Sequence, residues 1–151
     1  MEKLIVPNDK FFAPVVELLE QGKRVTIPVK GYSMLPFIRG ERDLVELEKA
    51  DEYVPGDIVL FHLGGRWIMH RILSISDGRA DIMGDGVLRG HEDCPLENIC
   101  GRAVAILRSG VKRVNPRSPG ELRKARFWRS LLPIRRYLVA VYRRLPWNRP
   151  I

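Results

Sequence analysis

Residues 24–36 read RVTIPVKGYSMLP. The first part of this stretch, 24–29, is rich in β-branched residues and predicts a strand. Gly31 and Pro36 then predict a tight turn around Ser33, because glycine lets the backbone turn and proline fixes the chain beyond it. A serine nucleophile needs such a turn, since its Oγ must be exposed while backbone N–H groups face the developing oxyanion. Serine is also a common turn former, so the turn by itself does not separate a nucleophile from an ordinary loop residue.

Short strands of similar character continue from this turn to about residue 107. Turn signals rich in glycine, such as Gly64-Gly65 and Asp77-Gly78, separate them. A short helix is predicted before them, over 11–21, because apolar residues recur there at helical spacing and Gly22 ends the run. Closely spaced short strands predict a mainly β fold with a small, partly closed sheet. The predicted strands cover 24–29, 43–48, 57–62, 67–75, 80–83 and 101–107.

The chain has 151 residues, which is enough for one domain with a hydrophobic core. Its net charge of +8 is distributed unevenly. From Arg108 to the end there are 13 lysines and arginines against one acid, Glu121, whereas the first 107 residues hold 13 bases and 17 acids. We therefore divide the chain into an N-terminal helix (1–23), a near-neutral β domain (24–114) and a basic tail (115–151).

The basic tail has the composition of an amphipathic surface helix. A linker-like segment, 115–120, precedes two helical runs over 121–132 and 134–145, in which arginines alternate with leucines and aromatic residues. This pattern predicts that residues 117–147 bind an anionic membrane surface. Binding to nucleic acid is disfavoured by the interleaved aromatic residues and leucines, and packing of the tail on the β domain is the other alternative.

Neither a secretory signal nor an apolar run of about 18 residues is visible. We therefore expect a cytoplasmic protein, which the basic tail would attach to the inner face of a membrane. Cys94 and Cys100 are too few for a disulfide scaffold or a four-ligand zinc site, and we expect a structural role for both. No metal and no cofactor are predicted.

Five short motifs, in this order, resemble those of the type I signal peptidases and LexA-like self-cleaving proteins. Together they span about residues 25–107, and their order makes the resemblance more specific than any single motif. The resemblance implies a β-rich fold with a groove for an extended peptide, and a nucleophilic Ser33. The motifs are Gly31-Tyr32-Ser33-Met34-Leu35-Pro36, Pro55-Gly56-Asp57-Ile58-Val59, Met69-His70-Arg71-Ile72, Met83-Gly84-Asp85-Gly86 and Ile99-Cys100-Gly101-Arg102-Ala103.

The base implied by the resemblance is a histidine. Bacterial signal peptidases and LexA-like proteins use lysine, but no lysine occurs here between Lys49 and Lys112. The motif that carries the base instead contains His70, followed by arginine, and is similar to the Ser-His signal peptidases of the endoplasmic reticulum and archaea. An unperturbed imidazole has a pKa of about 6.5 and can accept the serine proton at neutral pH.

A third group is expected to orient the imidazole. Two acids are candidates, and the resemblance favours Asp93 over Asp85, which occupies the Gly-Asp motif. Gly31 stands where many signal peptidases have a serine that donates to the oxyanion. The oxyanion hole is therefore expected to use backbone N–H groups of the nucleophile loop, including that of Ser33, with Tyr32, Met34 and Pro36 shaping the loop.

The sequence thus predicts a serine endopeptidase that cleaves a peptide or leader-like segment bound in extended form along a sheet edge. A self-cleaving regulator is an alternative, although residues 1–32 contain neither alanine-glycine nor cysteine-glycine as a cleavage site. The remaining alternative is a degenerate peptidase fold that binds peptide or membrane without catalysis.

Overall fold

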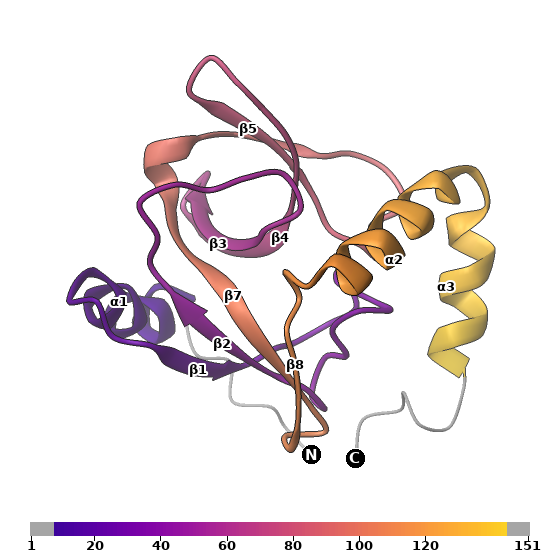
Figure 1. Ribbon diagram of the computed structural model, residues 1–151, viewed down its shortest axis with the longest axis horizontal. Helices are drawn as coiled ribbons and strands as arrows, with labels where there is room; N and C mark the ends of the chain where they lie inside the picture. Colours follow the sequence, from indigo (N-terminus) through magenta and orange to yellow (C-terminus); the bar gives the residue numbers. More distant parts are fainter. Residues whose placement is uncertain (1–7, 145–151) are drawn as a thin grey trace.

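The computed structural model describes residues 8–144 (Figure 1). These form a mixed α/β structure that is mainly β, with one N-terminal helix, an eight-stranded antiparallel open sheet and helices at the C-terminal end. The strands lie in the order β1-β2-β7-β3-β4-β5-β6, and β8 pairs with β7. Their bounds are β1 Val25–Pro28, β2 Leu44–Glu48, β3 Ile58–Leu63, β4 Arg66–Ser76, β5 Arg79–Met83, β6 Glu92–Pro95, β7 Ile99–Arg108 and β8 Lys112–Val114.

Strand β3 connects two hydrophobic cores, because its side chains are buried on both faces of the sheet. Ile58 and Leu60 pack in one core with Leu19 of helix α1 (Asn8–Glu20), and Leu19 is completely buried. Val59 and Phe61 point to the other face and pack with apolar residues of β4, β5 and β6. Each fully buried side chain of this size stabilises the fold by about 1.5–3 kcal/mol. Because β3 is anchored in both cores and pairs with β4, it fixes the position of β4, the strand that carries His70.

The predicted strands and helices are confirmed, with ends that differ by a few residues. The structure adds two strands, β6 and β8, that the sequence pattern did not predict, because they are only four and three residues long. Within residues 8–144, the sheet does not close on itself. Among the described residues, β1 and β6 are the two ends of an open strand order.

The C-terminal helices lie together on one side of the molecule, in orange and yellow in Figure 1. Helix α2 (Pro119–Ser130) begins after Ser118, whose hydroxyl accepts a hydrogen bond from the backbone N–H of Glu121. A 3₁₀ turn (η2, Leu132–Ile134) leads to α3 (Arg135–Arg144).

The segment before α2 is held to the sheet domain by an ion pair. Arg117 Nε lies 2.9 Å from Oδ1 of the buried Asp57. Within residues 8–144, no helix combines the length and the apolar character needed to cross a membrane. The N-terminal residues 1–7 and the tail residues 145–151, which belong to the sequence predictions above, lie outside the described residues.

Candidate active site

Ser33 lies in a turn whose following residues are buried. Gly31 adopts a φ of 80°, a conformation that favours glycine, and turns the chain after β1. Beyond the serine, the Ile38 N–H donates to the Met34 carbonyl at 3.0 Å. Met34, Leu35 and Ile38 are buried, whereas Ser33 is half-buried. Packing of its neighbours therefore fixes the serine at the edge of the core.

A second loop, Gly84-Asp85-Gly86, lies directly against this turn. The Gly86 N–H donates to the Ser33 carbonyl at 2.8 Å, and the Asp85 N–H contacts the Met34 Sδ at 3.4 Å. A Cβ atom at Gly84 would lie 2.3 Å from the Ser33 carbonyl oxygen and 2.9 Å from Cδ2 of His70. The absence of a side chain at Gly84 thus lets the Ser33 backbone and the His70 ring approach each other.

His70 is held from its other side by a carboxylate. Its Nδ1 contacts Oε1 of Glu92 on β6, and both side chains are largely buried. In an imidazole ring Cδ2 is bonded to Nε2, so the edge that faces Gly84 and the Ser33 turn is the edge that carries Nε2. With Nδ1–H donated to Glu92, Nε2 is the nitrogen that can accept a proton.

Unlike its carbonyl, which accepts from Gly86, the hydroxyl and the N–H of Ser33 are not engaged elsewhere among the described residues. Within the part of the chain that the structure describes, neither its hydroxyl nor its N–H takes part in an intramolecular hydrogen bond. No hydrogen bond joins Ser33 to His70 in this state, and catalytic hydrogen bonds are often long before substrate binds. Among the described residues, therefore, neither the hydroxyl nor the N–H of Ser33 has a competing hydrogen-bond partner.

Asp85, one of the two acids predicted to orient His70, has a different partner. Its carboxylate receives two hydrogen bonds from the buried Arg71, from Nε at 2.9 Å and from Nη2 at 2.8 Å. Arg71 also donates to the Gly56 carbonyl at 3.0 Å, and its guanidinium lies 5.0 Å from the centre of the Phe37 ring. Asp85 thus fixes the loop that supports Ser33.

Asp93, the favoured candidate, lies away from His70. It pairs with Arg79 at 2.8 Å on the exposed surface, with 70% of its side chain accessible. The neighbouring residue Glu92 contacts His70 instead, because successive residues of a strand point to opposite faces of the sheet. Of the three acids, Glu92, which the sequence interpretation did not name, is the one whose carboxylate contacts His70.

The tail helices reach the nucleophile loop and its supporting loop. Trp128 Nε1 donates to the Asp85 carbonyl at 2.6 Å, and Arg135 Nη1 donates to the Val87 carbonyl at 3.1 Å. The Arg143 guanidinium lies 4.0 Å from the centre of the Tyr32 ring, directly beside Ser33. The inner face of the tail is therefore part of the wall around the candidate site.

The two cysteines are free thiols. Burial raises the pKa of Cys94 to about 11 and that of Cys100 to about 11, so both are protonated at neutral pH. Neither thiol is a candidate nucleophile in this state. Among the described residues, no group of three or more histidine, cysteine, aspartate or glutamate side chains is arranged to hold a metal ion.

Comparison with known proteins adds no assignment to this geometry. The chain matches no protein-family model, and a search of the curated proteins finds no match either.

Proposed function

We propose that this protein is a serine endopeptidase in which Ser33 is the nucleophile, His70 the general base and Glu92 the residue that orients His70. The observation that supports this most strongly is the environment of the imidazole. Its Nδ1 contacts Glu92, and its opposite edge meets the Ser33 turn across a glycine that leaves no side chain between them. A nucleophile, a base next to it and a carboxylate on the far side of the base are the elements of a catalytic triad.

In the proposed reaction, His70 Nε2 accepts the hydroxyl proton as Ser33 Oγ bonds to the carbonyl carbon of the scissile peptide. The negative oxygen of the tetrahedral intermediate accepts a hydrogen bond from the Ser33 N–H. His70 then donates its proton to the leaving amine as the C–N bond breaks, which leaves an acyl-serine. Water attacks the acyl-serine in the same way and gives up a proton to His70, which returns it to Ser33 when the acid is released.

The substrate in this proposal is an extended peptide that pairs with the free edge of β1. Among the described strands, β1 pairs only with β2, so its other edge offers unpaired backbone groups. The chain passes from Pro28, the end of β1, to Ser33 within five residues. A peptide added to this edge would therefore continue toward the nucleophile.

The motif order that resembles the signal peptidases and LexA-like proteins supports the same proposal. Our proposal therefore includes a peptidase fold of that type and a substrate that is a peptide or leader-like segment. It also places the protein on the cytoplasmic side of a membrane. The two glycine-containing loops of these motifs, 31–36 and 83–86, are also the two loops in contact here.

Digestion of a peptide library derived from a whole proteome, with new termini identified by mass spectrometry, tests the proposal. We expect the wild-type protein to generate termini that disappear, by at least about a thousandfold in rate, with Ser33→Ala, with His70→Ala and with the double variant alike, because a triad acts as a unit. Ser74→Ala and His91→Ala are the matched controls, since both side chains are exposed. Cleavage that persists in Ser33→Ala would contradict the assignment.

A further inference from the structure

The exposed large apolar side chains of the described residues are concentrated on the C-terminal helices. Six of the eleven lie between residues 127 and 141, although this segment is a small part of the chain. The most exposed of these six are Phe127, at 67%, Val141, at 61%, and Tyr137, at 59%. The others are Leu132, Ile134 and Leu138. An exposed apolar cluster of this kind marks an interaction surface more often than a scattered set does.

Phe127, Tyr137 and Val141 lie on the outer faces of α2 and α3, whose inner faces pack on the domain. Leu132 and Ile134 lie in the η2 turn between the two helices. Ala125 of α2 and Val139 of α3 are buried. Residues four apart share a helix face, so Tyr137 and Val141 lie together on α3, and Phe127 lies with Arg123 on α2. Each helix thus has a buried inner face and an exposed outer face. Packing of the tail on the β domain explains the inner face but not the exposed apolar residues of the outer face.

Positive charge surrounds the apolar residues. Between residues 119 and 144 there are eight lysines and arginines, and the only acid in that segment is Glu121. The exposed bases Arg123, Arg126 and Arg129 form no ion pair within residues 8–144. An apolar surface with a cationic border has the composition that binds an anionic bilayer interface.

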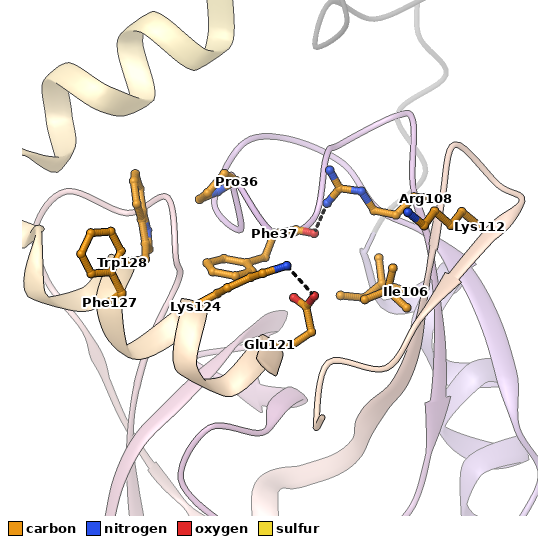
Figure 2. Close-up of a pocket in the computed structure, with 10 residues that line it drawn as sticks. Pro36, Phe37, Ile106, Arg108, Lys112, Glu121, Lys124, Phe127 and Trp128 are labelled. Atoms are coloured by element: carbon orange, nitrogen blue, oxygen red, sulfur yellow. Dashed lines mark hydrogen bonds and ion pairs between the residues drawn. The ribbon is translucent and has the colours of Figure 1, made fainter. Parts of the chain in front are cut away.

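A basic groove adjoins this surface under helix α2. It is a cavity of about 500 Å³ between α2, the nucleophile loop and the β7–β8 hairpin (Figure 2). Its polar lining consists of Arg108, Lys112, Lys124 and Glu121, and its apolar lining includes Phe127. Lys124 pairs with Glu121 at 3.1 Å, whereas Lys112 makes no ion pair among the described residues. Arg108 lies 4.0 Å from the carboxylate of the buried Asp43, so Lys112 supplies the unpaired positive charge of the groove.

We propose that the outer face of α2 and α3, together with this groove, binds the surface of an anionic phospholipid bilayer. A headgroup phosphate lies in the groove between Lys112 and Lys124, and Phe127 at its rim enters the interfacial region, followed by Tyr137 and Val141. Charge complementarity selects anionic lipid. The six apolar side chains favour a bilayer over nucleic acid, whose phosphates would be bound by the cations alone.

Flotation of the full-length protein with lipid vesicles tests this proposal and does not depend on peptidase activity. The probes are vesicles of phosphatidylglycerol and phosphatidylcholine, and vesicles of phosphatidylcholine alone. We expect flotation with the anionic vesicles at low salt, and loss of flotation at high salt or with neutral vesicles. Lys112→Gln with Lys124→Gln should weaken partitioning about 30-fold, because each base near the bilayer contributes about fivefold. Lys23→Gln with Lys49→Gln, two exposed bases outside the surface, is the matched control.

The apolar contribution is tested separately. Phe127→Ser should weaken partitioning about tenfold, and Phe11→Ser, an exposed phenylalanine on α1, should leave it unchanged. Circular dichroism checks that each variant is folded. Equal flotation of surface and control variants, or binding of the wild type to DNA but not to anionic vesicles, would overturn the proposal, whereas loss confined to the surface variants supports it.

Discussion

Nδ1 of His70 contacts Oε1 of Glu92 across strand β5, since His70 lies on β4 and Glu92 on β6, and each strand pairs with β5. The register brings them together: Arg71 pairs with Met83 and Ile82 with Glu92. The position on β5 beside His70 is therefore the start of the Gly84 loop. Without a side chain there, the imidazole lies between Glu92 and the Ser33 turn.

Glu92→Gln is expected to lower kcat for peptide cleavage by about 10²–10⁴-fold, because the amide no longer fixes the tautomer of His70 and no longer stabilises the imidazolium. Steady-state kinetics on a cleaved peptide measure this. Asp93→Asn is the matched control, since Asp93 is the adjacent residue but pairs with Arg79 on the opposite face. A loss of activity in Asp93→Asn with wild-type activity in Glu92→Gln would reverse the assignment.

The sequence interpretation named Asp93 and not its neighbour Glu92, which contacts His70, for a physical reason. Side chains alternate between the two faces of a strand, so a shift of one position exchanges every inward residue for an outward one. Strand β6 is four residues long and was not predicted, so nothing in the sequence indicated which of its two adjacent acids points inward. Once the strand is known, the buried Cys94 shows which face points inward, because Glu92 lies two positions before it and therefore on the same face.

Asp85→Asn is expected to destabilise the fold by about 3 kcal/mol, because it leaves the buried guanidinium of Arg71 without its charged partner. Urea denaturation with an unchanged m value measures the effect. Asp93→Asn, which removes an exposed ion pair, should cost at most about 1 kcal/mol. Similar stabilities of the two variants would show that Asp85 does not hold its loop in the way described above.

The two free thiols, of which Cys94 is buried and Cys100 half-buried, predict a dependence of stability on alkaline pH. Burial raises the folded-state pKa of Cys94 and of Cys100 from the ordinary value of about 9 to about 11. Above pH 9 the unfolded state releases these protons while the folded state retains them, so the free energy of unfolding should fall as the pH rises from 9 through 11. Thermal unfolding across this range measures the fall, and the Cys94→Ala, Cys100→Ala double variant should show a smaller one. An identical slope in both proteins would contradict the raised pKa values.

The local elements of the fold followed from the sequence better than its long-range contacts. Alternation and turn residues predicted the strands from β1 to β5 and β7, since these signals act within a few residues. Asp85 has a structural role because its carboxylate pairs with Arg71 and not with His70. Which of these two neighbours it meets depends on strand register, which a single sequence does not reveal. The contact of Trp128 with the Asp85 carbonyl likewise joins residues 43 positions apart.

Gly84→Ala is expected to reduce peptide cleavage by about a hundredfold, through displacement of the nucleophile. Its φ is not in the left-handed region, so the new methyl group acts by steric contact alone. That methyl would lie 2.3 Å from the Ser33 carbonyl oxygen, a backbone atom that must move, and 2.9 Å from the His70 ring. A displacement of about 1 Å between reacting groups is sufficient for a loss of this size.

The matched control is Gly120→Ala in helix α2, where a Cβ meets no other atom within 4 Å and alanine should be neutral or slightly stabilising. Peptide cleavage and thermal unfolding are measured for both variants. Reduced kcat in Gly84→Ala with a folded protein, beside an unchanged Gly120→Ala, is the expected result. Full activity in Gly84→Ala would mean that the close approach of Ser33 and His70 at this glycine is not needed for the reaction.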